Sequence, residues 1–416
     1  MMNILDMKKI VLINCYFGKF PWYFDFFIKS CATNPTVDFL IFSDAKYKES
    51  LPANVKIIFF TLEDFNVLAT KKLGFDVLVK KPYKLCDFKP AYGILFSDFL
   101  EEYDFWGMCD IDIIFGRIRE FITEDLLSEF DIINTRHDYL TGSFLLFKNT
   151  FEINSLFTKS KDYIKVFTSD RHFCFDECNF KHAEMEQGIS IFDVECEIES
   201  MEHVIRKEKE ANKCAVFFDL LVIDGLAGKM KWENGILGYD SKFEILLYHL
   251  IQYKSNILSK DPSWSDVSNI FYIDQYTFRR KSCTNGLGLL SFLYHNVFKI
   301  LQFKSKHFVE YFISVYFWPK VISNIDVGNY KNKLGSSILS VEKDSEGKNI
   351  VRSHFLKLVE NVLIESKFNS NVSFVKSLPN EKFTRIVNKN SNGNNIQIGY
   401  INGNISNYEM VHYLNK

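Results

Sequence analysis

Residues 106–115 read WGMCDIDIIF, an apolar run that carries two carboxylates, Asp110 and Asp112. Side chains two positions apart on a β-strand point to the same face, so we expect both carboxylates to reach one hard cation. Gly107 and Gly116 bracket residues 108–115 and permit a close backbone approach or a sharp turn. The stretch therefore predicts a divalent-cation site at the end of a buried strand. A pair of solvated acids at a strand end is the alternative.

Strands and helices are predicted to alternate on both sides of this stretch. Residues with high β-propensity indicate strands at 9–15, 38–43, 55–61, 131–135 and 143–147. Apolar residues at helical spacing indicate helices at 22–31, 63–73 and 92–100. This alternation favours an α/β fold with a mainly parallel sheet flanked by helices. Ligands bind such sheets at the carboxyl ends of the strands, which is where Asp110 and Asp112 are expected.

The composition excludes some classes of protein. The chain has 416 residues, enough to bury a full-sized core in one or two domains. Its 50 Lys and Arg residues balance 52 Asp and Glu residues, and the net charge of −2 argues against a nucleic-acid partner held by a basic surface. The first apolar run, residues 10–13, is too short for the core of a signal peptide and reads as a buried strand. We find no apolar stretch long enough to span a bilayer.

The nine cysteines are scattered and include no Cys-x-x-Cys pair. This usage indicates a reduced compartment, so we expect a cytoplasmic location, with the inner face of the cell membrane as the second option. Cys174, Cys178, His172 and His182 could be grouped as zinc ligands. Their spacing matches no familiar zinc motif, which favours free thiols instead.

The chain changes in character toward its C-terminus. We expect a catalytic domain over residues 1–258, a basic-aromatic helical extension over 259–327, and a small module of unassigned role over 328–416, with a helix at 353–366. Residues 276–320 combine basic and aromatic side chains, a pattern typical of amphipathic segments that contact anionic membranes. A pair of helices packed on the main domain explains the same pattern.

An ordered series of motifs between residues 9 and 254 carries a family resemblance: CYFGKFPWYFDFFIKSCATNP, FLIFSD, PYKLCDFKPAYG, FWGMCDIDIIFG, LTGSFLLFKN, FDE and YHLIQYK. In the order and spacing of these motifs, the chain resembles a family of bacterial GT-A-type glycosyltransferases found among capsule and lipopolysaccharide genes. The resemblance implies a GT-A-like, Rossmann-like fold. It also implies transfer of a hexosyl or related sugar from a UDP- or GDP-type nucleotide sugar to a glycan or lipid-linked glycan.

The resemblance implies a metal site as well. Asp110 and Asp112 match the metal-binding pair of the family, and His249, within YHLIQYK, matches a third protein ligand. The expected cofactor is Mn²⁺ or Mg²⁺, and an imidazole ligand favours Mn²⁺. Without the resemblance, a lone histidine in an apolar stretch is more often a core residue.

Nucleotide-sugar contacts are expected first in the loop after the first strand. Tyr16 and Phe17 offer aromatic rings to the base, and Gly18 lets the backbone approach the ligand. Asp44, at the end of the second strand, offers a carboxylate to the ribose. A strand-to-helix turn with core aromatic residues is the alternative.

Further donor contacts are expected in PYKLCDFKPAYG, beside Asp110. Lys84 and Lys89 offer point charges to the diphosphate, and Asp87 offers a carboxylate to the ribose or to a sugar hydroxyl. Lys84 and Asp87 also stand at helical spacing, so an exposed ion pair is the alternative.

The expected reaction is attack of an acceptor hydroxyl on the anomeric carbon while a cation assists departure of the nucleoside diphosphate. If the reaction inverts the anomeric centre, a carboxylate must take the acceptor proton, and Asp176 and Glu177 are the candidates. If it retains the configuration, no such base is needed. Two rival functions remain: a nucleotidyltransferase that activates sugars, against which the absence of a Gly-rich phosphate loop counts, and a non-catalytic membrane- or carbohydrate-binding protein.

Overall fold

The structure is a computed structural model that divides into two compact units, Met1–Leu220 and Leu221–Lys416. It describes residues 7–280, with gaps at 137, 219–221, 227, 240–242, 257–258, 263 and 265, and the backbone of eight strands between residues 328 and 401. The division into domains at residues 258 and 327 that the sequence suggested stays a prediction.

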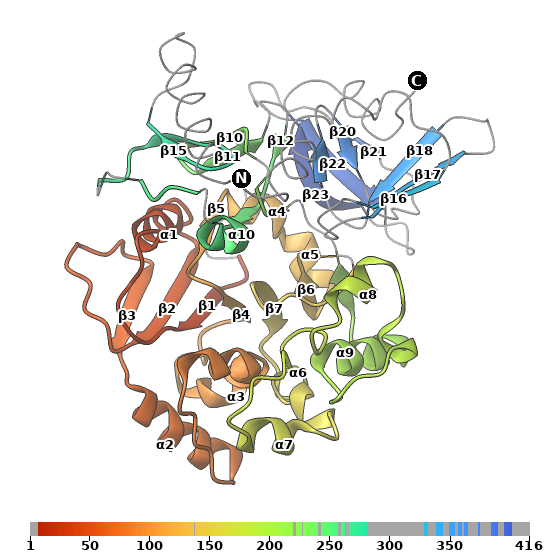
Figure 1. Cartoon of the computed structure of the whole chain (residues 1–416). Helices are drawn as coiled ribbons and strands as arrows, with labels where there is room; N and C mark the ends of the chain where they lie inside the picture. Colours follow the sequence, from red (N-terminus) through yellow and green to blue (C-terminus); the bar gives the residue numbers. More distant parts are fainter. Residues whose placement is uncertain are drawn as a thin grey trace, which may run out of the picture. The chain divides into compact units, whose positions relative to one another are not determined.

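The first unit is built on a seven-stranded sheet in the order β3-β2-β1-β4-β7-β6-β8 (Figure 1). Its strands are β1 (Ile10–Cys15), β2 (Val37–Ser43), β3 (Val55–Phe59), β4 (Phe105–Cys109), β6 (Ile132–Asn134), β7 (Phe144–Lys148) and β8 (Val216–Phe218). The pairs β1–β2, β2–β3, β1–β4 and β6–β8 are parallel, whereas β7 runs antiparallel to β4 and β6. The expected α/β fold with a mainly parallel sheet is confirmed. All five strands predicted before residue 150 are present.

The helices of the first unit are α1 (Phe24–Ala32), α2 (Leu62–Leu73), α3 (Tyr92–Leu95), α4 (Ile118–Phe121), α5 (Glu124–Glu129), α6 (Phe151–Asn154), α7 (Tyr163–Thr168), α8 (His182–Glu186) and α9 (Met201–Glu210). Residues Pro82–Ala91, Ser97–Phe99, Leu156–Lys159 and Ile191–Asp193 form 3-10 turns, and a short strand β5 covers Ile113–Phe115. The predicted helices at 22–31 and 63–73 are confirmed. The helix predicted at 92–100 is wrong as one continuous element, because it ends after one turn at Leu95 and continues as a 3-10 turn.

Both faces of the sheet are covered by aromatic side chains. Phe39 of β2 packs against Phe27 of α1, with ring centroids 6.1 Å apart. Phe42 lies on the opposite face of the same strand and stacks on Phe96, beyond α3, at 4.1 Å. Figure 1 accordingly shows α1 on one side of the sheet and α3 on the other. A strand covered on both faces leaves its carboxyl end as the place where polar groups can reach solvent.

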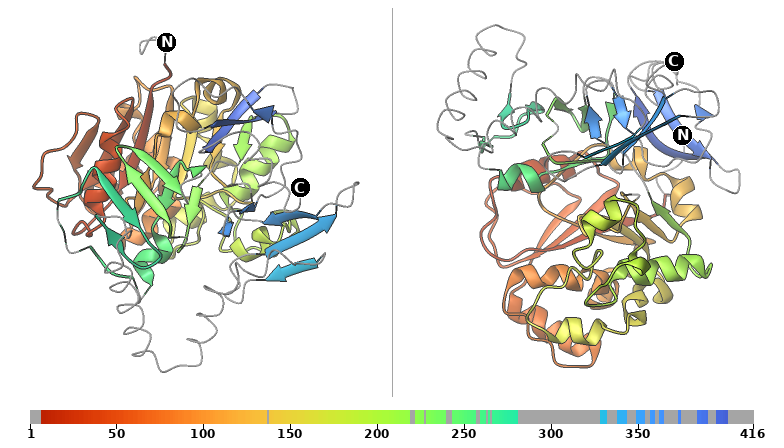
Figure 2. Two further views of the ribbon diagram at one scale, coloured as in Figure 1. Left: turned by 90° about the horizontal axis from the view of Figure 1, so that it is seen from above. Right: turned by 45° about the vertical axis from the view of Figure 1, so that its right-hand side comes forward.

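The second unit is mainly β-structure. Its elements are β9 (Val222–Asp224), β10 (Met230–Glu233), β11 (Ile236–Tyr239), β12 (Phe243–Glu244), β13 (Leu247–His249), α10 (Ile251–Ser255), β14 (Ile270–Ile273), β15 (Phe278–Arg279), β16 (Gly328–Lys331), β17 (Ile338–Lys343), β18 (Asn349–Ser353), β19 (Lys357–Val359), β20 (Val362–Ile364), β21 (Ser373–Phe374), β22 (Thr384–Lys389) and β23 (Asn395–Ile401). One sheet has the order β15-β14-β10-β11-β12-β23-β22-β21. Strands β16, β17 and β18 form a separate antiparallel ribbon, which is visible in Figure 2.

Two expectations for this part of the chain differ from the structure. The helix predicted at 353–366 is wrong, because β19 and β20 form an antiparallel pair there. Short apolar runs do not distinguish helix from strand by periodicity. The helical extension expected over 259–327 is likewise wrong over its described residues up to 280, where the elements are the strands β14 and β15. Residues 281–327 lie outside the described residues, so the rest of the extension and its membrane contact stay predictions. Among the described residues, we find no helix with the length and apolarity needed to cross a bilayer.

Candidate functional site

Asp110 and Asp112 lie just beyond the carboxyl end of β4, in the turn that leads to β5. The expectation that the pleat of a strand brings them to one face is therefore wrong; the turn positions them instead. The backbone N–H of Asp110 donates to the carbonyl oxygen of Ser143 at 3.0 Å, which fixes the start of the turn. Asp112 is only 3% exposed. Strand β4 is parallel to β1, so both acids follow the carboxyl end of a parallel strand, as predicted.

Lys89 places a positive charge beside this turn. Its ammonium group lies 2.7 Å from Oδ1 of Asp110 and 3.8 Å from Oδ2 of Asp176, and it donates to the carbonyl oxygen of Gly142 at 2.8 Å. Burial opposes the charged form, but the charges of Asp110 and Asp176 raise the pKa of Lys89 well above its usual value. Lys89 is thus a fixed positive charge that holds Asp110 and Asp176 on one side of the site.

Asp176 approaches the backbone at Gly142 closely. A methyl group placed on Gly142 would lie 2.1 Å from Oδ2 of Asp176, so only glycine fits at this position. Burial raises the pKa of Asp176 well above its usual value, although Lys89 opposes this effect. Of the two candidate bases, Asp176 is the one that faces Lys89.

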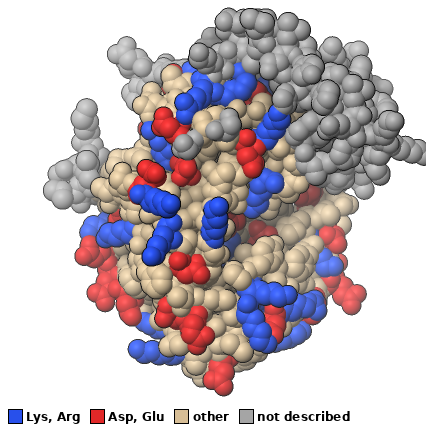
Figure 3. All heavy atoms as spheres, turned by 60° about the vertical axis from the view of Figure 1, so that its left-hand side comes forward, with Lys and Arg blue, Asp and Glu red and all other residues tan. Residues whose placement is uncertain are grey.

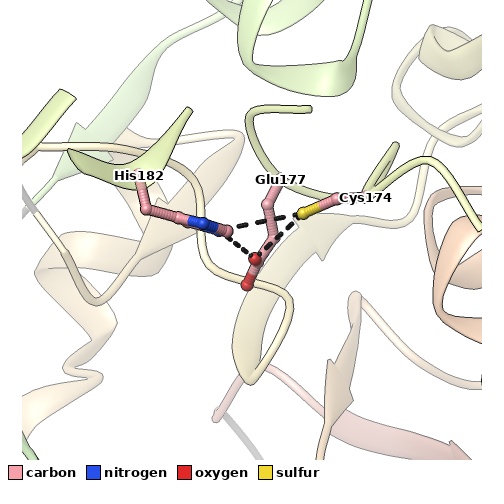
Figure 4. A group of neighbouring side chains, drawn as sticks. All are labelled: Cys174, Glu177 and His182. Carbon is pink, nitrogen blue, oxygen red and sulfur yellow. Dashed lines mark hydrogen bonds and ion pairs between the residues drawn. The ribbon is translucent and has the colours of Figure 1, made fainter. Parts of the chain in front are cut away.

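Glu177 points to a different group of side chains (Figure 4). Its Oε2 lies 2.7 Å from Nε2 of His182 and accepts from the thiol of Cys174 at 3.3 Å, while its Oε1 accepts from the backbone N–H of Gly142 at 2.7 Å. Burial opposes the charged form of Glu177, yet the hydrogen bonds from His182 and Gly142 lower its pKa to about 2. Burial likewise opposes the charged form of His182, and the contact with Glu177 outweighs it and raises the pKa. The two neighbouring acids of the FDE motif therefore have different partners.

Lys84 and Asp87 form a buried pair, with Nζ and Oδ2 2.8 Å apart and side chains 2% and 0% exposed. The ammonium of Lys84 also donates to the carbonyl oxygens of Val166 and Arg171, each at 2.6 Å. These contacts give Lys84 a structural role. The alternative interpretation of the sequence expected Lys84 and Asp87 to pair on the surface; they do pair, but the pair is buried. The carboxylate of Asp87 also accepts hydrogen bonds from two backbone N–H groups just before Asp176. These are the N–H groups of Phe173, at 2.9 Å, and of Phe175, at 2.8 Å.

Helix α9 also holds the loops that carry Gly142 and Asp176. The backbone N–H groups of its first residues, Met201 and Glu202, donate to the carbonyl oxygens of Phe175 and Glu177. The carboxylate of Glu202, which is 1% exposed, accepts from the N–H of Leu140 at 2.7 Å. These bonds satisfy N–H groups that have no partner within the helix and tie residues 140–142 to residues 175–177.

The loop after β1 combines a core residue with exposed groups. Phe17 is 9% exposed and packs in the core, as the alternative for this loop expected. Tyr16 stacks on Phe20 at 5.6 Å, and Gly18 has a φ of 98°, a backbone conformation that favours glycine. The N–H of Gly18 donates to Oδ1 of the exposed Asp44 at 2.8 Å, so the loop is tied to the end of β2.

Two residues near the acidic turn were missed by sequence reasoning. Burial, and after it the charge of Asp112, raise the pKa of the Tyr23 hydroxyl, which places this tyrosine beside the turn. The amide of Asn14 donates to the carbonyl oxygen of Cys109 at 2.6 Å and joins the ends of β1 and β4. A polar residue at the end of an apolar strand is the signal that could have identified Asn14.

His249 ends β13 in the second unit, where it pairs in register with Asp224 of the parallel strand β9. Its Nδ1 lies 2.9 Å from Oδ1 of Asp224, and its side chain is 9% exposed. A carboxylate at one ring nitrogen orients an imidazole and selects the other nitrogen as a ligand atom. The ring of His249 is therefore oriented by a carboxylate, as the rings of metal-binding histidines usually are.

Basic and acidic side chains are mixed over the face of the molecule shown in Figure 3. The eight described cysteines are free thiols.

Comparison with known proteins identifies the family. The model of DUF6625, a family of unknown function, matches residues 12–282, more than half of the chain, so the chain belongs to this family. No curated protein matches it in sequence.

Several solved glycosyltransferases are similar to part of the chain. Mouse xyloside xylosyltransferase 1 is 9% identical, with a TM-score of 0.30, over 52% of this chain and 87% of that chain. GlyE of Streptococcus pneumoniae TIGR4 is 13% identical, with a TM-score of 0.23, over 51% of this chain and 45% of its own. The galactosyltransferase LgtC, solved with donor and acceptor sugar analogs, is 10% identical, with a TM-score of 0.26, over 51% of this chain and 76% of its own.

Proposed function

We propose that this member of the DUF6625 family is a metal-dependent glycosyltransferase of the GT-A-like type. It moves a sugar from a nucleotide-diphosphate donor to a glycan or lipid-linked acceptor in bacterial surface polysaccharide synthesis. The observation that carries the proposal is the acidic turn after parallel strand β4, where Lys89 lies 2.7 Å from Asp110 and Asp112 is buried. Open α/β sheets bind their ligands at this edge, and divalent cations bind carboxylates and substrate phosphates together. The ordered motifs of the sequence support the same reading.

The ligand set that we propose for the cation is the one that the sequence resemblance implies, Asp110, Asp112 and His249, which offer two carboxylates and one imidazole. These donors fit Mn²⁺ better than Mg²⁺, because Mn²⁺ accepts an imidazole ligand more readily than Mg²⁺ does. Asp224 orients the ring of His249 so that Nε2 is the ligand atom. The bound ion would supply charge neutralisation for the departing nucleoside diphosphate.

The remaining residues of the site have distinct roles in the proposal. Lys89 is a positioning residue, because its contacts orient the carboxylates of Asp110 and Asp176. Asp176 would take the proton of the acceptor hydroxyl if the anomeric centre is inverted. Tyr16 offers its ring to the donor base, and Asp44 offers a carboxylate to the ribose while it holds Gly18.

The decisive test measures hydrolysis of UDP-, GDP- and CMP-sugars by the full chain with Mn²⁺, with Mg²⁺ and with a chelator. We expect one class of donor to be hydrolysed only with a divalent ion, and Asp112→Asn to abolish this activity. Asp98→Asn, at a side chain that is 74% exposed, is the matched control and should act like the wild type. Turnover that ignores both the metal and Asp112 would disprove the proposal.

Binding can be tested separately from turnover. A nucleotide sugar with Mn²⁺ should raise the melting temperature of the wild type and of Asp98→Asn, and should not raise that of a folded Asp112→Asn variant. Release of pyrophosphate from a nucleoside triphosphate and a sugar phosphate would instead identify a nucleotidyltransferase.

A further inference from the structure

We propose that Cys174, Glu177 and His182 form a second metal site, separate from the acidic turn, which binds a thiophilic divalent cation such as Zn²⁺. Figure 4 shows that the three side chains converge. The Sγ atom of Cys174 lies 3.3 Å from Oε2 of Glu177 and 3.8 Å from Nε2 of His182. The remaining pair, Oε2 of Glu177 and Nε2 of His182, is 2.7 Å apart. Each residue thus directs one ligand atom to a common point.

The spacing of these atoms is close to what zinc requires. Tetrahedral zinc, with bonds of about 2.3 Å to sulfur and about 2.0–2.2 Å to nitrogen or oxygen, keeps neighbouring ligand atoms roughly 3.4–3.6 Å apart. Both distances from the sulfur fall near this range. The carboxylate and the imidazole would have to separate by roughly 0.7 Å to reach it. Their side chains are 22% and 33% exposed, so a small rotation can provide that movement.

The backbone of the segment supports a built site. Cys174, Asn179 and Phe180 all have positive φ angles, of 53°, 51° and 61°. Positive φ is uncommon for residues other than glycine and asparagine, and residues in this conformation cluster at ligand clamps and active sites. The carbonyl oxygen of Cys174 accepts from the N–H of Asn179 at 3.1 Å, which closes a turn that brings Cys174 and Glu177 together.

The surroundings orient the ligands and leave access for an ion. Oε1 of Glu177 is held by the N–H of Gly142, which turns Oε2 toward Cys174 and His182. Cys174 is 4% exposed, whereas His182 is partly open to solvent, so water can complete the coordination. A sulfur and a nitrogen donor select zinc over Mg²⁺ or Mn²⁺, in contrast to the two carboxylates of the acidic turn.

The other two candidate zinc ligands in the sequence lie elsewhere. Cys178 packs in an apolar cluster with Tyr139, Met185 and Ile191, and Nδ1 of His172 lies 3.1 Å from Oδ1 of Asp87. The spacing Cys-x-x-Glu-x4-His explains why a search for paired cysteines and histidines finds no familiar motif. Asp176 is the neighbour of Glu177, so an ion at this site would anchor the loop that carries Asp176.

The test is the metal content of the full chain, purified without added metal, dialysed and then loaded with Zn²⁺ or Co²⁺. We expect one tightly held equivalent of Zn²⁺, and with Co²⁺ a thiolate-to-metal charge-transfer band in the near ultraviolet. Cys174→Ser should lose the band and the zinc, and His182→Gln should weaken zinc binding at least tenfold. Cys178→Ser, at a buried thiol four residues away, is the matched control and should keep both. Circular dichroism confirms that each compared variant is folded.

A second readout covers a variant that does not fold. In the wild type, Zn²⁺ should slow alkylation of Cys174, mapped by peptide mass spectrometry, and a chelator should abolish this protection. Asp112→Asn should keep the zinc and the band, so this result is independent of the glycosyltransferase assay. Three results would overturn the proposal: wild-type protein that binds no zinc, a cobalt band that survives Cys174→Ser, or zinc that is lost from Asp112→Asn and kept by Cys174→Ser. In the first case the three side chains are an ion pair beside a buried thiol.

Discussion

The ammonium group of Lys89 lies 2.7 Å from the carboxylate of Asp110, with the lysine side chain 9% and the aspartate side chain 31% exposed. The same ammonium lies 3.8 Å from Asp176, so one buried cation serves two carboxylates on different loops. Buried charges of this kind depend on their partners, because removal of one partner leaves the other uncompensated. This relationship links the stability of the first unit to the geometry of its candidate site.

Replacement of Lys89 by methionine should therefore be costly. The change keeps most of the volume but removes the charge that faces Asp110 and Asp176, and we expect a loss of about 3–5 kcal/mol in the free energy of unfolding. The control is Lys148→Met. Lys148 lies 3.1 Å from Asp131 but is 44% exposed, so this change should cost less than about 1 kcal/mol. Urea unfolding of both variants gives the comparison, and equal losses would show that Lys89 is not an essential counter-charge.

Gly142→Ala should disturb Asp176 directly. The new methyl group would lie 2.1 Å from Oδ2 of Asp176 and 3.3 Å from Oε1 of Glu177, so the carboxylate of Asp176 must move. We expect a loss of about 1–3 kcal/mol in stability. If the proposed function is correct, transferase activity should fall at least tenfold, since displacement of a reacting group by about 1 Å has large effects on rate.

The matched control for this change is Gly238→Ala. The nearest atoms to a methyl group on Gly238 are 3.7 Å and 3.8 Å away, which is ordinary contact. Stability should change by no more than about 0.5 kcal/mol, and activity should be unaffected. Thermal melts and the donor hydrolysis assay distinguish the two variants. Wild-type activity in a folded Gly142→Ala variant would rule out a role for the position of Asp176.

The sequence predicted the sheet well because its strands are strongly apolar and lie in regular alternation with helices. It placed Asp110 and Asp112 at the correct edge of the sheet, but on a strand rather than in the turn that follows it. Short strands end within one or two residues of where propensity suggests, and a turn can then bring two acids together by a different geometry.

Burial and long-range pairing could not be predicted from the local pattern. Lys84 looks like a surface lysine, and its partners include the carbonyl oxygens of Val166 and Arg171, more than eighty positions away. The group of Cys174, Glu177 and His182 depends on left-handed backbone at Cys174, a conformation that a cysteine rarely adopts. The order of motifs identified the candidate site, but the role of each charge depends on contacts between distant loops.

Asp87→Asn should loosen the loop that carries Asp176. The carboxylate of Asp87 accepts from the N–H groups of Phe173 and Phe175 and from Lys84, and an amide can accept at only one of its two ends. We expect a loss of about 3–5 kcal/mol, because Lys84 also loses its buried counter-charge. Limited proteolysis should then cut residues 171–177 sooner than in the wild type.

The control for Asp87→Asn is Asp162→Asn. Asp162 also accepts from a backbone N–H, that of Glu199 at 2.8 Å, but it is only half-buried and lies outside the Lys84 pair. This variant should be cut at the same rate as the wild type within residues 171–177. Unchanged proteolysis of Asp87→Asn would show that other contacts hold the loop.

The stability of the first unit should fall in mild acid because of His203. Its Nδ1 accepts from the N–H of Ser200 at 3.1 Å and lies 3.0 Å from the Ser200 hydroxyl, so it caps helix α9 in its neutral form. Burial, the largest effect, lowers the pKa of His203 below its ordinary value of 6.5. The unfolded chain therefore takes up a proton at a higher pH than the folded protein. The contribution of His203 is complete above about pH 6.5 and declines as the pH falls toward the folded pKa.

His203→Gln tests this prediction, since glutamine keeps an acceptor for the cap but does not titrate. The melting temperatures of both proteins should be similar at about pH 7.5, and at about pH 5.5 the melting temperature of the wild type should fall further than that of the variant. The difference between the two proteins isolates His203 from the other groups that titrate over this range. An equal loss of melting temperature in the two proteins would mean that the pKa of His203 is the same in the folded and the unfolded chain, and the assigned role of His203 at the start of α9 would then be wrong.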